Sequence, residues 1–158
     1  MKPTRKLSES IRFKGGRSLI VRKLKEIEEY DVAEAYGIKC KGVTIRWISE
    51  KRLGGPEYKH NFALRYFVFQ PGGYLPLHKH PWEQEIVVVK GTLETTSGGR
   101  TVKNEPGDIV YIPADEEHGF RNIGDGTCEF YCIIGCVGEG ENCIGLGEPH
   151  KGENDNSR

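Results

Sequence analysis

From Gly42 onward, short apolar or alternating runs are separated by turn residues at close intervals. The runs are four to eight residues long: Val43–Ile48, Phe62–Phe69, Ile86–Val89, Ile109–Ile112 and Glu129–Ile134. The breaks between them are rich in glycine: Gly54-Gly55-Pro56, Pro71-Gly72-Gly73, Ser97-Gly98-Gly99, Glu105-Pro106-Gly107 and Gly124-Asp125-Gly126. Glycine makes up 21 of the 158 residues, against an average usage of about 7%. Many short strands joined by tight turns predict an all-β sandwich or barrel.

The two ends of the chain carry weaker signals. Ile20, Leu24 and Ile27 fit one face of a helix, whereas Leu19-Ile20-Val21 could equally begin a strand, so this segment stays open. After Gly145 the sequence is polar and has no aromatic residue, which predicts a disordered terminus. The expected organisation is an N-terminal extension with lead-in strands (1–60), a barrel (61–137), and a C-terminal loop with a disordered tail (138–158).

Composition narrows the class of partner. Lys and Arg together number 23, and Asp and Glu also number 23, so no net charge favours nucleic acid or an anionic membrane surface. A small molecule is the expected ligand. No apolar run approaches the roughly 18 residues of a membrane span, and the basic start Met1–Lys6 lacks the apolar core of a signal peptide. A cytoplasmic location is therefore predicted.

Three histidines have the spacing of a split metal site. His78 and His80 are two residues apart, and on a strand they would point to the same face because side chains alternate. A third imidazole, from His118 on a distant strand, could complete the cage.

The order of these residues resembles the signature of the cupin family, and in particular that of its small single-domain members. The first half is Gly72, five residues, His78-Lys79-His80, three residues, Gln84, six residues and Gly91. The second half is Gly107, five residues, Pro113, then His118, three residues and Asn122. The resemblance implies a double-stranded β-helix, or jelly-roll, barrel. It also implies a divalent transition metal ion (Mn, Fe, Ni, Cu or Zn) held by His78, His80, Gln84 and His118, and a homodimer.

Gln84, the fourth ligand implied by the resemblance, could bind the ion directly or through a bridging water. Glu83 and Glu85 flank it and should point to the opposite face of an extended segment. A kink at Pro81 would make either one the rival ligand.

Two positions depart from the family pattern. Gln84 stands where cupins have Glu or His, and a neutral amide oxygen would leave more of the positive charge on the ion. Asp115 stands where the family usually has Gly. Since Asp tolerates turn conformations, this second change should alter the turn and not the site. Gly91 and Asn122 are expected to have structural roles in tight connections.

Three further residues are candidate pocket residues. Arg65 lies within the apolar run Phe62–Phe69, and its guanidinium needs either an acidic side chain or an anionic ligand. Phe130 and Cys132 share one face of the last strand by alternation. Because cupin strands bury one face toward the metal-bearing cavity, this resemblance makes Phe130 and Cys132 candidate walls of the pocket.

Four of the five cysteines lie close together, at Cys128, Cys132, Cys136 and Cys143, while Cys40 stands apart. Buried reduced thiols are the simplest interpretation. The spacing lacks the Cys-x-x-Cys pairs of zinc ribbons, but a zinc site stays open, as does a disulfide such as Cys136–Cys143.

Function follows from the site, because one fold hosts many chemistries. The first hypothesis is a metal-dependent oxidoreductase, dioxygenase-like, that acts on a small organic molecule. The second is a non-catalytic module that binds or senses a small molecule, and the third is a purely structural unit. Catalytic residues stay unassigned, since the candidate general bases are limited to Glu83, Glu85 and Tyr66.

Overall fold

The computed structural model describes residues 10–12, 18–49 and 60–135. The strands in these ranges are β1 (Ser10–Arg12), β2 (Ser18–Ile20), β3 (Glu29–Asp31), β4 (Lys41–Ser49), β5 (Phe62–His78), β6 (Gln84–Lys90), β7 (Leu93–Ser97), β8 (Arg100–Asn104), β9 (Ile109–Ile112), β10 (His118–Asn122) and β11 (Cys128–Gly135). The 3-10 helix η1 (Leu24–Glu26) and the helix α1 (Val32–Tyr36) are short. Within the described ranges, no helix has the length and apolar character needed to cross a membrane. The C-terminal tail predicted to be disordered lies outside these residues.

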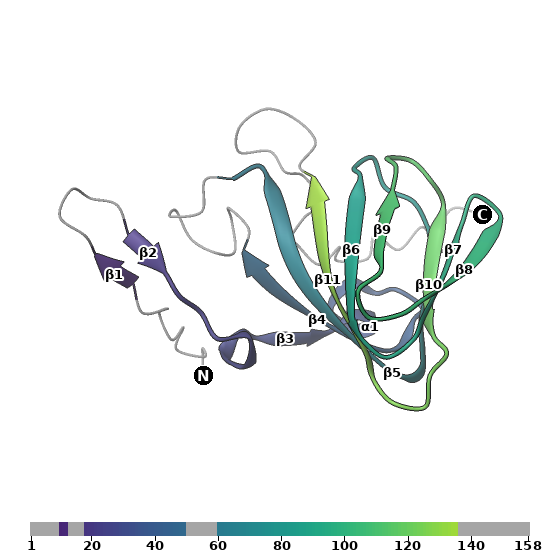
Figure 1. Ribbon diagram of the computed structural model, residues 1–158, viewed down its shortest axis with the longest axis horizontal. Helices are drawn as coiled ribbons and strands as arrows, with labels where there is room; N and C mark the ends of the chain where they lie inside the picture. Colours follow the sequence, from purple (N-terminus) through teal and green to yellow (C-terminus); the bar gives the residue numbers. More distant parts are fainter. Residues whose placement is uncertain (1–9, 13–17, 50–59, 136–158) are drawn as a thin grey trace.

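Nine strands form one curled sheet (Figure 1), in the order β8-β7-β10-β5-β11-β6-β9. β4 pairs with the free edge of the first half of β5, and β3 pairs with β4. In Figure 1, β11, β6 and β9 stand together in the middle of the view, with β10, β7 and β8 beside them on the right. Every pairing is antiparallel. This arrangement confirms the all-β jelly-roll barrel with an N-terminal extension.

The long strand β5 joins the two parts of the barrel. Its first half pairs with β4 and β11, whereas its second half pairs with β10, where His78 lies opposite His118. The turn predicted at Pro71-Gly72-Gly73 is wrong, because the strand continues through it. The extra residues form an irregularity against β4, where Lys41 pairs with Tyr74 and Val43 with Phe69. This bend carries the end of β5 to the wall that holds the metal-site candidates.

Residues 18–37 resolve the ambiguity between helix and strand that the sequence left open. Leu19 and Ile20 belong to β2, whereas Leu24 lies in the single 3-10 turn of η1. The only α-helix of the described residues is α1, which begins after Asp31, whose carboxylate accepts a hydrogen bond from the Glu34 amide at 3.0 Å. It ends at Gly37, which has a left-handed conformation with φ of 65°.

Asn122 closes the connection between β10 and β11. Its side chain is 1% exposed, and its Nδ2 donates to the backbone carbonyls of Phe69, Gln70 and Gly126. Its Oδ1 accepts a hydrogen bond from the Gly124 amide at 2.9 Å. The two hydrogens of Nδ2 are therefore shared among three carbonyls, and Oδ1 binds one backbone amide, in agreement with the structural role expected for Asn122.

Gly91 is required in the connection between β6 and β7. Its φ is 76°, and a Cβ added there would lie 2.5 Å from the Thr127 carbonyl oxygen and 2.8 Å from the Cys128 Cα. We expect Gly91→Ala to lower the free energy of unfolding by about 2–4 kcal/mol, since it combines left-handed strain with overlap against backbone atoms. Chemical denaturation would measure this loss. The matched control is Gly126→Ala, where no atom lies within 4 Å of an added Cβ; an equal loss in both variants would contradict the explanation.

Candidate metal centre

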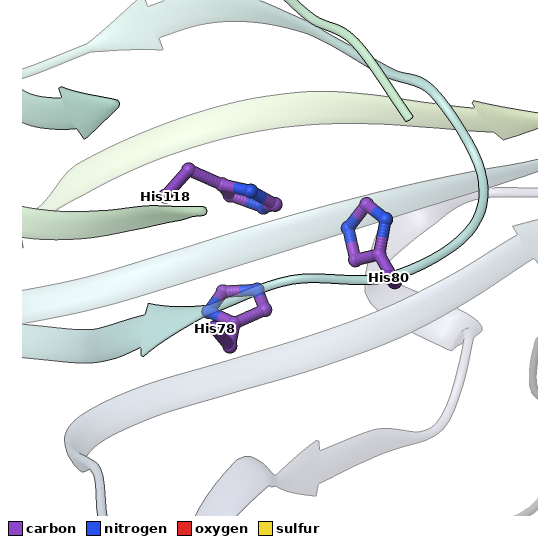
Figure 2. A group of neighbouring side chains, drawn as sticks. All are labelled: His78, His80 and His118. Atoms are coloured by element: carbon purple, nitrogen blue, oxygen red, sulfur yellow. The ribbon is translucent and has the colours of Figure 1, made fainter. Parts of the chain in front are cut away.

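Three histidines from two neighbouring segments converge on one point (Figure 2). His78 is the last residue of β5 and His118 the first of β10, and the two are paired across the sheet. His80 follows two residues after β5. The ring centroids of His78 and His80 lie 4.4 Å and 4.8 Å from that of His118, and one ligand nitrogen from each ring lies within 4.8 Å of the others. The three rings lie together as predicted, although His80 lies past the end of β5 and not on the strand with His78.

Backbone carbonyls fix the protonated nitrogen of each ring. Nδ1 of His78 lies 2.8 Å from the Pro76 oxygen, Nδ1 of His80 lies 2.7 Å from the Trp82 oxygen, and Nδ1 of His118 lies 2.8 Å from the Glu116 oxygen. A carbonyl only accepts, so each Nδ1 carries the hydrogen and each Nε2 keeps its lone pair. Nε2 of His118 is buried and has no hydrogen-bond partner within the described part of the chain. These three nitrogens fit a divalent transition metal ion.

The electrostatic environment keeps the rings neutral. Burial lowers the pKa of His78 and His80, and the field of Arg65 adds to this effect. For His118, burial is again the largest cause, and His78, His80 and Arg65 add to it, so that its pKa falls to about 4. Neutral imidazole is the form that binds metal. Near neutral pH, no proton therefore has to be removed from His118 before an ion can bind.

Gln84 lies beside the three rings at the start of β6. It is 4% exposed, and its Oε1 is 3.1 Å from Nε2 of His80. Because Nδ1 of His80 carries the hydrogen, Oε1 and Nε2 face each other as two acceptors. A cation between them would remove this repulsion, as would an amide turned so that its NH₂ group donates to His80. The side chain can thus be either a ligand or a hydrogen-bond donor to one.

The predicted candidate bases all lie away from the three rings. Glu83 and Glu85 are exposed on either side of the buried Gln84, and Glu83 accepts a hydrogen bond from the Tyr111 hydroxyl at 2.8 Å. Tyr66 also lies on the outer face, where its hydroxyl donates to the Glu129 carboxylate and its ring contacts Tyr131. None of these three side chains can exchange a proton with a molecule held at the histidines.

The loop before β10 supports the site through its backbone. Asp115, which stands where cupins usually have Gly, has φ of 62° and donates its amide hydrogen to the His80 carbonyl at 2.8 Å. An aspartate tolerates this left-handed conformation better than most residues. As predicted, the substitution changes the turn residue and preserves the approach to His118.

The three candidate pocket residues share the inner face of the barrel. Arg65 and Cys132 are paired between β5 and β11, and Nη2 of Arg65 donates to Cys132 Sγ at 2.8 Å. Phe130 is 1% exposed, and its ring centroid lies 5.2 Å from that of Phe67 and 5.8 Å from that of Phe120. Phe120 in turn lies 5.5 Å from the His118 ring. The aromatic cluster therefore extends to the histidines.

Two aromatic residues near the site were missed by sequence reasoning. Trp82 stacks on His80 with a centroid distance of 4.6 Å and an angle of 7°. Trp47 lies on the inner face of β4, and its Nε1 donates to the Tyr36 hydroxyl at 2.7 Å. The signal for Trp47 was its alternation with Val43 and Ile45, and the signal for Trp82 was its place directly after His80-Pro81.

Two of the clustered cysteines, Cys128 and Cys132, are buried free thiols. Burial raises the pKa of both, and that of Cys128 reaches about 11. They agree with the interpretation as buried reduced thiols. Cys136 and Cys143, on which the zinc and disulfide alternatives depend, lie outside the described residues.

Comparison with known proteins gives the family. A family model described as a cupin domain matches residues 65–134, which include the three histidines and Gln84. The oxalate-binding protein of Thermotoga maritima is 31% identical over 81 residues, or 49% of this chain and 67% of that protein. The chain belongs to the cupin family.

Other cupin relatives share a smaller part of their length. The polyketide synthase CurC of Streptomyces cyaneus is 39% identical over 59 residues, which cover 37% of this cupin and 38% of that protein. Two further curated relatives are matched over only 21% and 46% of their lengths. Among solved structures, the polyketide cyclase RemF from Streptomyces resistomycificus has a TM-score of 0.62 at 26% identity, covering 79% of this chain and 89% of that one.

Proposed function

We propose that this cupin binds one divalent transition metal ion through His78, His80 and His118, with Gln84 as fourth ligand, and that a small organic molecule binds at the ion. The observation that carries the proposal is the hydrogen bonding of the three rings. Each Nδ1 is held by a carbonyl, so three lone pairs face one point, and the buried Nε2 of His118 has no partner among the described residues. Such an arrangement costs free energy unless a cation offsets it.

The reaction we propose is oxidation of the bound molecule by molecular oxygen, as in a dioxygenase. A bound transition metal ion supplies Lewis acidity and, for a redox-active metal such as iron, manganese or copper, reactivity toward oxygen. We assign no general base to the site, since Glu83 and Glu85 are exposed and the hydroxyl of the buried Tyr66 is hydrogen-bonded to Glu129. The side chains around the ion would orient the ligand and exclude water. A reaction that needs no general base from these three residues is therefore favoured over hydrolysis or proton abstraction.

The second candidate is binding or sensing without turnover. Two observations favour it: the neutral amide of Gln84 at the fourth position, and the similarity to a protein that is described as binding oxalate. The names of the polyketide-related proteins support a small organic ligand in either case. The predicted homodimer stays a prediction.

Metal content tests the proposal. We expect untagged wild-type protein to contain close to one transition metal ion per chain by mass spectrometry, and His80→Ala to lose it, because one of three imidazoles is removed. The matched control is Lys79→Ala, since Lys79 lies between His78 and His80 and is exposed. Equal metal content in wild type and His80→Ala would contradict the proposed ligands. With the metal in place, oxygen consumption on addition of small organic acids and phenols would separate the enzyme from the binding module.

A further inference from the structure

Arg65 is a cation on the inner face of the barrel. It lies in β5 between Ala63 and Phe67, which are both buried on the same face. Its guanidinium carbon lies 5.1 Å from the centroid of the Phe67 ring and 5.5 Å from that of Trp47. These aromatic contacts favour a cation, but they do not use its hydrogen-bond donors.

The donors of Arg65 are poorly satisfied within the described part of the chain. The one hydrogen bond seen for the guanidinium is from Nη2 to Cys132 Sγ, and a neutral thiol sulfur is a weak acceptor. Nε of Arg65 is buried without a partner. By contrast, Arg46 on the neighbouring strand pairs with the Glu29 carboxylate at 2.6 Å. No Asp or Glu of the described residues is buried, so the acidic partner that the sequence left open for Arg65 is not found there.

The charge of Arg65 adds to the positive charge of the proposed metal site. Burial is the largest cause of the lowered pKa of His78, His80 and His118, and the positive charge of Arg65 acts in the same direction on each ring. Three neutral imidazoles and a neutral amide bring no negative charge to a divalent ion, and Arg65 adds a further positive charge. Enclosing this much positive charge without a counterion is costly, and an anionic ligand would offset the cost.

We propose that Arg65 binds a carboxylate group of the small molecule that coordinates the metal, so that the ligands of this site are small carboxylates. The inference rests on the proposed function, since the second anchor of the ligand is the metal ion. A guanidinium suits this role because its planar set of donors matches the two oxygens of a carboxylate. A carboxylate is also a far better acceptor than the Cys132 thiol. Arg65 therefore selects anionic ligands over neutral ones of the same size.

Oxalate is the probe for the test, and isothermal titration calorimetry on Co²⁺-loaded protein is the measurement. We expect wild type to bind oxalate and Arg65→Gln to bind it on the order of 10- to 100-fold more weakly, the usual effect of losing a charged hydrogen bond to a buried group. Arg65→Lys keeps the charge but loses the planar donors, so it should fall between the two. The matched control is Arg121→Gln on the outer face, where Arg121 is exposed over the Tyr74 ring; it should bind oxalate like wild type.

Failure of the metal site and failure of this inference give different results. The visible spectrum of bound Co²⁺ reports the ligands directly and should be the same in wild type and Arg65→Gln before oxalate is added. Equal affinity of these two proteins for oxalate would overturn the role of Arg65, as would no binding to wild type at all. If no Co²⁺ binds, the proposed function fails, and the metal-free proteins still test Arg65. Oxalate should then raise the melting temperature of wild type and not that of Arg65→Gln, and equal shifts would overturn the inference.

If Arg65→Gln does not fold, as judged by circular dichroism, the comparison of wild type with Arg65→Lys takes its place. In that case a weaker affinity of Arg65→Lys supports the inference, and an unchanged affinity overturns it.

Discussion

The metal-free protein is expected to lose up to about 3 kcal/mol of stability between pH 6.5 and pH 4 through His118 alone. Its pKa is about 4 in the folded chain, against an ordinary value of 6.5. The unfolded chain therefore binds a proton more readily than the folded chain. This contribution to stability is fully present above pH 6.5 and is lost as pH falls through the folded pKa.

The surroundings of His118 explain why its pKa is lowered. The ring is fully buried, which is the largest cause, and the charges of His78, His80 and Arg65 further disfavour a positive charge on it. The carbonyl of Glu116, which accepts from Nδ1, acts in the opposite direction but is outweighed. The pKa values of His78 and His80 are lowered as well, so their contributions have the same sign.

Denaturant titrations in the presence of a chelator, at several pH values from 7.5 to 4, would measure this loss. His118→Gln removes the titrating group, and although it is less stable at pH 7.5, its stability should fall less steeply with pH than that of wild type. Parallel curves for the two proteins would mean that His118 is not the group responsible. Added metal should raise the wild-type curve without flattening it, because the ion binds the folded chain, in which the ring is already neutral near pH 7.

The strands that were found from the sequence and those that were missed differ in composition. Each of the five apolar runs lies inside a strand of the barrel. The strands β7, β8 and β10, with the sequences LETTS, RTVKN and HGFRN, are largely polar. In β8 only Asn104 is buried, so no apolar alternation marks it. β8 is placed by its pairing with β7 across the turn at Ser97-Gly98-Gly99. The sequence predicted this turn but not the strand that follows it.

The features of the site also divide into those that could be predicted from the sequence and those that could not. The spacing of His78, His80 and His118 was sufficient to group them, because the family signature joins His118 to the closely spaced His78 and His80. The exposure of Glu83 and Glu85 beside a buried Gln84 also followed from alternation. The isolation of Arg65 from any described acidic partner did not. It depends on the register that sets Trp47 and Cys132 beside Arg65 from two different strands, and a single sequence does not contain that register.

Gln84→His is expected to raise the affinity for a divalent transition metal ion, on the order of 10- to 100-fold, because imidazole is a stronger donor than an amide oxygen. Position 84 is buried beside His80 Nε2, so an imidazole there would join the other three. Competition with a chelator such as EDTA would measure the change in affinity. Gln84→Leu, which offers no donor atom, should bind the ion more weakly than wild type.

The matched control is Glu85→His, which adds a histidine to the next position of the same strand. Glu85 is exposed and lies opposite Tyr111 on β9, so its replacement should leave the affinity at the wild-type value. If Gln84→His, Gln84→Leu and wild type all bind metal equally, position 84 does not face the ion, and its amide instead donates to His80. If only Gln84→His binds metal, the natural site is too weak to hold an ion with three imidazoles and one amide, and the proposal of a metal-dependent dioxygenase is then wrong. The observed order of affinities therefore decides between a ligand, a hydrogen-bond donor and a site that has lost its metal.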